Sequence, residues 1–238
     1  MPASAIGATD VYQDALTNYL VSMARTTEVS VNRALDALLT LDPALARAVF
    51  INEPRLNEME MIIDEHAVKL LRRKDLAEAA FAEEDIRQIV ATLKVNNDLE
   101  RMGDLAVSLG QRALSLSAMH VVDMPQELEP MVTAVRAMVT KSLGALIYRN
   151  VDLAQEVLQS DAEVDDYRDR LFETIAGSMA ERPLAIAASV QVLLATRHLE
   201  RIGDHCTNIA EDIFFWVRGL DVRHGRALQT AQDTTKKL

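Results

Sequence analysis

The amino-acid sequence predicts an all-α fold made of two tandem three-helix bundles, six helices in all, related by an internal repeat. Glycine and proline are scarce, with eight and six among 238 residues, and aromatic residues make up only 4%, a composition that favours helices over strands. Apolar residues recur at intervals of three and four, the period of a helix with one buried stripe. The same order of helices then returns in the second half, which indicates duplication of a three-helix unit.

The first bundle is predicted over residues 11–118. Its first helix covers residues 11–40, and the apolar stripe of this helix consists of Leu16, Leu20, Met23, Val31, Leu35 and Leu38. Asp42 followed by Pro43 is typical of an N-cap and a first helical position, so a second helix is predicted over residues 43–73.

The third helix is predicted over residues 83–117, with an early apolar face that contains Ile86, Ile89, Val90 and Leu93. The row through Ile86 and Val90 continues at the same spacing into Asn97, Glu100 and Asp104. A stripe that is expected to begin as core therefore turns acidic, which is an unusual place for charge.

The second bundle is predicted over residues 126–218, after a connecting segment at residues 120–129 that contains Pro125. Its helices are predicted over residues 130–149, over residues 151–179, and from the proline break at 182–183 to Arg218. Residues 222–238 lose the apolar period, and we expect them to form a frayed C-terminal tail.

The repeat is visible in the residues as well as in the helix order. Residues 99–104 read LERMGD and residues 199–204 read LERIGD, so five of six positions are identical. In the second helix of each half, residues 53–57 (EPRLN) align with residues 161–165 (DAEVD). Acidic residues thus recur at matched positions on two helices of each bundle.

These acidic motifs have the spacing of cation ligands. Residues four apart lie on one side of a helix, so Glu100 with Asp104, and Glu200 with Asp204, each present two carboxylates to one cation. A solvated helix face explains a single such pair, but two matched pairs in a duplicated chain favour a site. If the carboxylates face other acids across packed helices, a cation is the expected counterion. Oxygen donors suit Mg²⁺, Mn²⁺, Ca²⁺ and ferric iron.

Other residues near the motifs are expected to have structural roles. Gly103 and Gly203 each cost about 1 kcal/mol relative to alanine in mid-helix, which close helix packing or metal access would explain. His205 and Cys206 follow the second motif, but leucine and alanine stand at the equivalent positions of the first half. Ligands shared by both sites would be duplicated, so these two residues are predicted to be structural.

Composition excludes several classes of function. A formal net charge of −11 disfavours binding to nucleic acid, which requires a basic surface. The lone Cys206 gives no disulfide framework, so a cytoplasmic location is expected. No run approaches 18 uninterrupted apolar residues, and we expect contact with a membrane only through partners. The sequence has no Gly-rich phosphate loop and no HExxH or GxSxG motif.

The duplicated Leu-Glu-Arg-hydrophobic-Gly-Asp motif resembles that of the PhoU family, and the resemblance extends over nearly the whole chain, including residues 62–65, 201–209 and 217–219. It implies tandem three-helix bundles whose E(D)xxxD motifs bind multinuclear metal clusters of iron, zinc, manganese or magnesium. It also implies a cytoplasmic, non-enzymatic negative regulator of high-affinity phosphate uptake and of the phosphate-starvation response. The implied partners are the ATPase subunit of the phosphate ABC transporter, the sensor histidine kinase of the phosphate two-component system, and a second copy of the chain in a homodimer.

Carried over by position, the resemblance gives eight metal-ligand candidates. They are Glu53, Asn57, Glu100 and Asp104 in the first half, and Asp161, Asp165, Glu200 and Asp204 in the second half. Asn57 departs from the pattern because Asp165 keeps an acid there, so the first site is expected to bind metal more weakly or with a different nuclearity. Glu60 and Asp64 continue the same helical row and are candidates to compensate.

Two alternatives remain open from the sequence. The first is a carboxylate-bridged di-metal enzyme in a helical bundle, although no histidine follows a glutamate at the Glu-x-x-His spacing of such enzymes. The second is a purely structural helical adaptor whose acidic rows are solvated. Metal content after purification without chelators separates the adaptor from the other two.

Overall fold

The fold consists of six long α-helices, one short α-helix and one short 3₁₀ helix, η1 (Pro183–Ala185), in the part of the chain that the computed structural model describes, residues 6–72, 82–119 and 124–223, with side chains from residue 15 onward. The long helices are α1 (Ile6–Thr40), α3 (Glu53–Leu71), α5 (Glu83–Ser117), α6 (Leu128–Tyr148), α7 (Val151–Glu181) and α8 (Ile186–Arg218). No strand occurs in these ranges, so the all-α prediction is confirmed. Of the predicted tail, residues 222–238, only Val222 and Arg223 lie inside these ranges; Val222 is buried in the core and Arg223 pairs with Asp221, so the prediction that the frayed tail begins at residue 222 was wrong.

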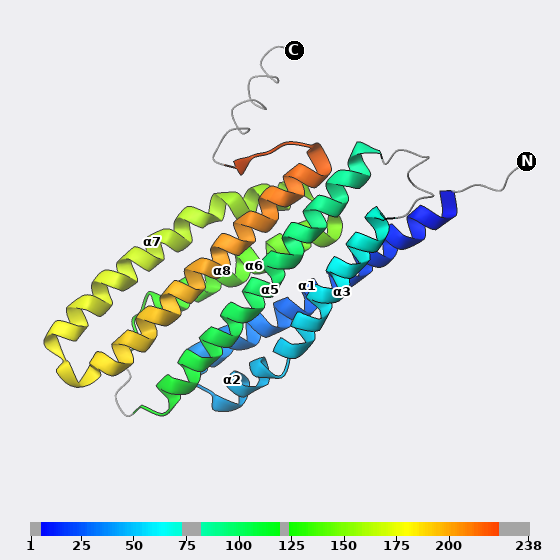
Figure 1. Cartoon of the computed structure of the whole chain (residues 1–238). Coiled ribbons are helices and arrows are strands. Elements are labelled where there is room, and N and C mark those ends of the chain that lie inside the picture. The colour runs from blue at the N-terminus through cyan, green and yellow to red at the C-terminus, as the bar shows by residue number, and fades with distance from the viewer. Residues whose placement is uncertain (1–5, 73–81, 120–123, 224–238) are drawn as a thin grey trace, which may run out of the picture.

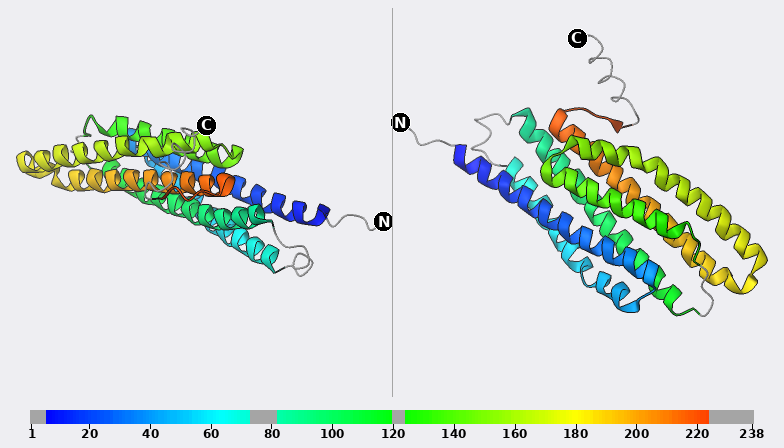
Figure 2. Two further views of the ribbon diagram at one scale, coloured as in Figure 1. Left: turned by 90° about the horizontal axis from the view of Figure 1, so that it is seen from above. Right: turned by 180° about the vertical axis from the view of Figure 1, so that it is seen from behind.

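The helices form two layers that join the two halves of the chain. Figure 1 shows α5 and α8 side by side in the centre, with α3 next to α5 and α7 next to α8. Seen from behind in Figure 2, α1 and α6 form the second layer. Helices α1, α3 and α5 pack as one bundle and α6, α7 and α8 as the other, while α5 packs on α8 and α1 on α6. Each contact between the halves thus joins helices at equivalent positions of the repeat.

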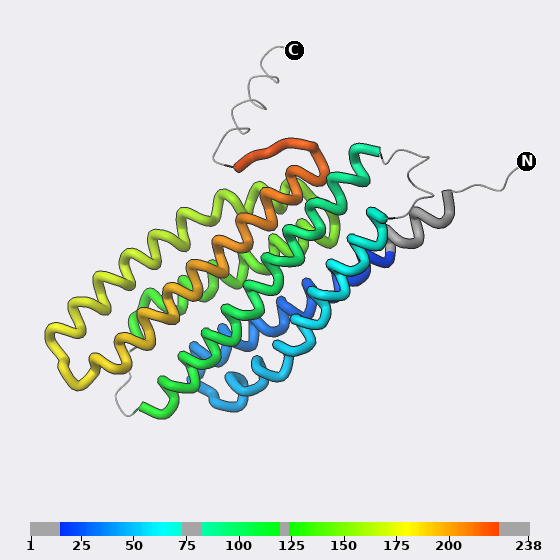
Figure 3. The backbone as a smooth tube through the Cα atoms, viewed as in Figure 1, coloured from blue at the N-terminus to red at the C-terminus, as the bar shows by residue number. Residues whose placement is uncertain are grey.

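The second predicted helix is interrupted, which corrects the prediction of one helix over residues 43–73. Helix α2 covers Pro43–Phe50, and α3 begins at Glu53, as the tube in Figure 3 also shows. Pro54 lies in the first turn of α3, where its missing N–H is harmless. A continuous helix would place the ring of Pro54 against the carbonyl of Phe50, so the chain breaks just before it.

Three other helix ends have capping residues of the usual kind, and Asp42 is the one predicted from the sequence. The Oδ1 atom of Asp42 accepts a hydrogen bond of 2.7 Å from the backbone N–H of Ala44 at the start of α2. Asn150 caps α7 in the same way, accepting from the N–H groups of Asp152 and Leu153. Helix α8 ends at Gly219, which has φ of 66° and therefore adopts the left-handed conformation that glycine tolerates best.

The burial of apolar side chains confirms the predicted stripe on α1 and corrects the predicted stripe on α5. All six apolar residues of the α1 stripe are buried: Leu16, Leu20, Met23, Val31, Leu35 and Leu38. On α5, Ile89 is buried, but Ile86 and Val90 are 46% and 38% exposed. The prediction that Ile86 and Val90 lie in the core was wrong. The buried face of α5 packs against α1, α3 and α8, and the row through Ile86 and Val90 lies outside that face.

Helix α6 is long and apolar enough, by composition, to cross a membrane. In this fold it packs against α7, α8 and α1, and half of its most apolar 18-residue window is buried. Packing within the bundle therefore accounts for its apolar character.

Candidate functional site

The acidic residues of the first half flank a tight contact between α3 and α5. At this point Leu56 of α3 faces Gly103 of α5, and a Cβ atom added to Gly103 would lie 2.7 Å from Leu56 Cδ1. Glycine therefore permits the close approach of the two helices. Glu53, Asn57 and Glu60 flank Leu56 on α3, and Glu100 and Asp104 flank Gly103 on α5; we call these five residues the first acidic cluster.

Glu100 has an unusual environment for a carboxylate. Its side chain is only 14% exposed, and its Oε2 atom is buried without a hydrogen-bond partner. The nearest cation, Arg101, has its Nε atom 3.4 Å from Oε2 without forming a hydrogen bond. Desolvation, followed by the charge of Asp104, raises the pKa of Glu100; Arg101 opposes this and Glu60 adds to it. Glu100 thus has a buried oxygen without a hydrogen bond, and the only cation near it in the described part of the chain is the half-exposed Arg101, at ion-pair distance.

The other predicted residues of the first half are less enclosed. Glu53 is half-buried and Asn57 is exposed on α3, whereas Asp104 lies 3.6 Å from Arg101 Nη1. Glu60 stands close enough to Glu100 to act on its pKa. Asp64 is engaged elsewhere, because its Oδ1 atom accepts a hydrogen bond of 3.0 Å from Asn96. Of the two residues proposed to compensate for Asn57, Glu60 is therefore the better placed.

The acidic residues of the second half lie in the equivalent place between α7 and α8. Val164 of α7 faces Gly203 of α8, as Leu56 faces Gly103, although here a Cβ atom on the glycine would be 3.6 Å from Val164 Cγ1. Around this contact the structure brings together Asp161, Asp165, Glu200 and Asp204, which we call the second acidic cluster.

Burial and, after it, mutual repulsion raise the pKa of two carboxyl groups in the second cluster. Desolvation, then the charges of Asp165 and Glu200, raise the pKa of Asp161, and Arg168 opposes them. Desolvation, then Glu200, Asp161 and Asp165, also raise the pKa of Asp204, which remains exposed on one side. The four predicted residues of this half therefore influence one another as a group.

Arg168, which sequence reasoning missed, lies on the second cluster. Its Nη1 atom is 2.7 Å from both Asp165 Oδ1 and Glu200 Oε1, and its Nη2 atom is 2.9 Å from Asp169 Oδ1. Hydrogen bonds to Asp169 and Glu200 raise the pKa of the guanidinium. The repeat contained a signal for it, because the alignment of residues 53–57 with 161–165 places Arg168 opposite Glu60.

The two clusters differ in how well they suit a metal ion. In the arrangement described for residues 15–72, 82–119 and 124–223, no three Asp, Glu, His or Cys side chains converge as a metal site. The first cluster nevertheless fits a hard cation chemically, because it offers only oxygen donors and includes the unpartnered Oε2 atom of Glu100. In the second cluster a guanidinium already bonds two of the carboxylates.

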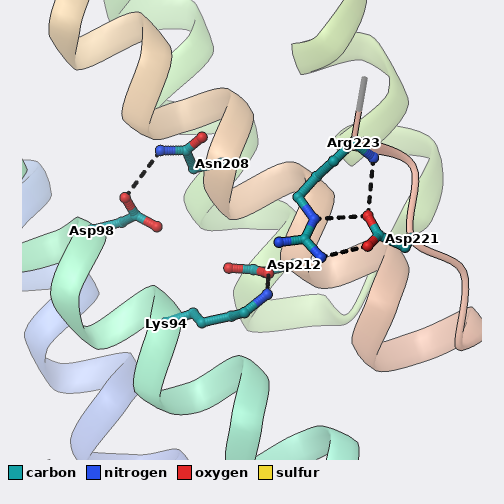
Figure 4. A network of polar contacts seen from close by, with 6 residues as sticks. All are labelled: Lys94, Asp98, Asn208, Asp212, Asp221 and Arg223. Atoms are coloured by element: carbon teal, nitrogen blue, oxygen red, sulfur yellow. Dashed lines mark hydrogen bonds and ion pairs between the residues drawn. The ribbon is translucent and has the colours of Figure 1, made fainter. Parts of the chain in front are cut away.

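A separate polar network joins α5 to α8 between the halves. Asp98, buried on α5, accepts hydrogen bonds from His205 Nδ1 at 2.8 Å and from Asn208 Nδ2 at 3.2 Å. Lys94 forms an ion pair of 2.7 Å with the buried Asp212 (Figure 4). His205 thus contacts a partner outside the acidic clusters, in agreement with its expected structural role.

Comparison with known proteins identifies a matching family model and similar proteins. The family model of the PhoU domain matches residues 20–113 and again 128–213. A Pseudomonas aeruginosa protein named as a phosphate-specific transport system accessory protein PhoU homolog is 37% identical over 211 residues, 87% of this chain and 84% of that protein. A homolog of the same name from Clostridium acetobutylicum is 30% identical over 203 residues, 85% of this chain and 91% of that protein.

Solved structures show the same architecture. The crystal structure of PhoU from Pseudomonas aeruginosa superimposes with a TM-score of 0.84 at 33% identity, covering 89% of this chain and 99% of that one. The phosphate transport system regulatory protein PhoU from Streptococcus pneumoniae gives a TM-score of 0.80 at 23% identity, covering 90% and 99%. The latter likeness concerns the fold alone.

Proposed function

This chain belongs to the PhoU family, and we propose that it is a negative regulator of high-affinity phosphate uptake and of the phosphate-starvation response. The observation that carries the proposal is the match of both halves to the PhoU domain, together with relatives named as accessory proteins of phosphate-specific transport. The protein acts without catalysis, in the cytoplasm, through contacts with other proteins.

Its partners in this proposal are the ATPase subunit of the phosphate ABC transporter and the sensor histidine kinase of the phosphate two-component system. The names of the relatives support the first partner. Exposed apolar side chains at equivalent positions of the two halves, Ile86 and Val90 on α5 and Ile186 and Val190 on α8, support a role in protein contacts. The functional unit is a homodimer, which light scattering of the purified protein would test.

The proposal includes binding of metal ions, iron, zinc, manganese or magnesium, by the predicted ligands of the two clusters. The first cluster would hold the ion through Glu53, Asn57, Glu100 and Asp104, and the second through Asp161, Asp165, Glu200 and Asp204. The metal would bind the buried Oε2 atom of Glu100, which has no hydrogen-bond partner. Without it, Glu100 remains a desolvated carboxylate with no hydrogen-bond donor on Oε2.

The regulatory role is tested by phosphate uptake and a starvation reporter in phosphate-rich medium. A deletion strain is compared with strains carrying the wild type or a variant in which Glu100, Asp104, Glu200 and Asp204 are all changed to alanine. We expect deletion to release both uptake and reporter, and the quadruple variant to restore neither to the wild-type level. A deletion that changes neither readout would contradict the regulatory role.

A matched control separates the clusters from a general loss of negative charge. In it, four exposed acids outside the clusters, Glu58, Glu84, Asp152 and Glu173, are changed to alanine. This control is expected to regulate like the wild type. If the cluster variant also regulates like the wild type, the acidic clusters have no part in regulation, although the regulatory role itself stands.

A further inference from the structure

The two halves place opposite charges at equivalent positions next to their acidic clusters. Leu56 faces Gly103 in the first half and Val164 faces Gly203 in the second, which fixes the correspondence of α3 with α7 in space as well as in sequence. Counting from these contacts, Glu60 and Arg168 occupy the same position, one turn after the facing residue. The duplication has therefore produced a glutamate beside one cluster and an arginine beside the other.

Arg168 bonds the second cluster from within the protein. One atom, Nη1, lies 2.7 Å from an oxygen of Asp165 on its own helix and 2.7 Å from an oxygen of Glu200 on α8. Its side chain is only 31% exposed and Glu200 only 20%, so the contact is more enclosed than an ordinary surface pair. Charge-assisted hydrogen bonds of this length are the stronger kind. The guanidinium thus supplies the positive charge that a cluster of acids requires.

Nothing equivalent neutralises the first cluster. Glu60 adds a negative charge close to Glu100, whose Oε2 atom is buried without a hydrogen bond. Arg101 reaches Glu100 and Asp104 only at 3.4 and 3.6 Å, and its side chain is 53% exposed. A cation from solution would therefore gain more at the first cluster than at the second.

We propose that Arg168 is a built-in cation that competes with metal for the second cluster, so that divalent ions bind more tightly at the first cluster. This inference rests on the metal binding included in the proposed function. A divalent ion at the second cluster must displace the guanidinium from its hydrogen bonds to Asp165 and Glu200, whereas at the first cluster it competes only with the longer ion pairs of the half-exposed Arg101. The structure thus reverses the ranking that Asn57 alone suggests.

Mn²⁺ titration of the full-length, chelator-treated protein by calorimetry tests the inference. Glu100→Gln removes a donor from the first cluster and so isolates the second. We expect Glu100→Gln to bind Mn²⁺ weakly, and Glu100→Gln combined with Arg168→Gln to bind it about tenfold more tightly, the equivalent of about 1.4 kcal/mol. Adding Glu200→Gln should abolish this gain, which would place the ion at the second cluster.

Arg170→Gln is the matched control. Arg170 lies on the same helix and pairs with Asp166 at 2.8 Å on the exposed side, so its loss changes the net charge equally. It is expected to leave Mn²⁺ binding unchanged in the Glu100→Gln background. The exchange in the other direction, Glu60→Arg in the otherwise wild-type chain, should weaken Mn²⁺ binding about tenfold while the helix content, measured by circular dichroism, stays unchanged.

The outcomes distinguish this inference from the proposal on which it rests. If Glu100→Gln binds Mn²⁺ equally tightly with and without Arg168, the inference is wrong while metal binding stands. If neither the wild type nor any variant binds Mn²⁺, both the inference and the metal binding are wrong. Because the expected result is a gain of binding, a misfolded variant cannot imitate it.

Discussion

Glu100 illustrates how a single residue can be held in an unfavourable state by the fold around it. Its carboxylate lies on α5 close to Glu60 of α3, and its buried Oε2 atom has no hydrogen-bond donor. A buried acceptor without a partner typically costs about 1–3 kcal/mol. In the absence of metal, the residue is therefore a local weakness of the first bundle.

Replacing this charge should stabilise the metal-free protein. We expect Glu100→Gln to raise the free energy of unfolding at neutral pH by about 1 kcal/mol, which corresponds to about 2–4 °C in Tm. The pKa of Glu100 is raised in the folded state, so the wild type gains stability from protonation as the pH falls through that pKa. The advantage of the variant should shrink over the same range.

Thermal melts of both proteins at several pH values, with a chelator present, measure this effect. Glu84→Gln, an exposed change on the same helix, serves as the control and should leave Tm nearly unchanged. A lower Tm for Glu100→Gln at neutral pH would contradict the prediction, because it would mean that the charged carboxylate stabilises the fold.

Cys206 should be unreactive in the folded protein. Its side chain is fully buried in α8, and desolvation raises the pKa of the thiol to about 12. Since the thiolate is the reactive form, a disulfide reagent should label the native chain at least about a hundredfold more slowly than the chain in denaturant. Equal labelling rates in native buffer and in guanidinium would contradict the position of this residue in the core.

The sequence predicted the acids of the clusters but not the residue that neutralises one of them. Glu100 and Glu200 were found because a repeated motif draws attention to identical residues. Arg168 was missed because the equivalent residue of the first half, Glu60, carries the opposite charge. A comparison of the two halves that looks for identical residues does not select such a position. Ile86 and Val90 were misplaced because helical periodicity defines a face without showing whether a neighbouring helix covers it.

At the level of whole helices, composition and period were sufficient for most of the fold. The ends of α2, α7 and α8 follow from local chemistry at Asp42, Asn150 and Gly219. The interruption between α2 and α3 also has a local cause, Pro54, but apolar residues continue on both sides of it and conceal the break in the periodic pattern. Which pairs of helices pack together is not encoded in any single helix and came from the structure.

The glycines of these helices should respond differently to substitution by alanine. Gly177 has nothing within 4 Å of an added Cβ atom, and at Gly203 the closest atom is 3.6 Å away, so both changes should stabilise the protein by about 1 kcal/mol. Gly103→Ala should gain less or lose stability, because its Cβ would lie 2.7 Å from the buried Leu56. Urea unfolding of the three variants provides the comparison.

Combining Gly103→Ala with Leu56→Val distinguishes crowding from other effects. The shorter side chain imitates the Val164–Gly203 contact of the second half and should recover part of the stability that the alanine removes. A Gly103→Ala protein as stable as Gly203→Ala would instead mean that α3 and α5 separate at little cost.

For the molecule as a whole, the contacts between the halves predict cooperative unfolding. Helix α5 packs along α8, α1 packs on α6, and Arg136 bridges α6 to Asn32 and Asp36 of α1 at 2.8 and 2.6 Å. We therefore expect one unfolding transition rather than two. Fluorescence of Trp216, the single tryptophan and a core residue of the second half, should change at the same denaturant concentration as the helical signal of the whole chain.

Weakening the contact between α5 and α8 should reveal the individual halves. Asp98→Ala removes the acceptor shared by His205 and Asn208 and should cost about 1–3 kcal/mol. If the wild type already shows two transitions, with fluorescence and helical signal at different midpoints, the halves are thermodynamically independent despite their contact.

The polar network between α5 and α8 also makes the two ends of the contact between these helices different. When two identical subunits meet about a twofold axis, every substitution at the interface appears twice, and both ends of the interface remain alike. Here the two copies are joined in one chain, so a residue can change in one copy and not in the other. Lys94 and Asp212 form an ion pair, whereas the equivalent positions, 194 and 112, are leucine and arginine. A protein that binds across the two halves therefore meets a surface whose two ends differ, and it can discriminate between the two orientations of docking.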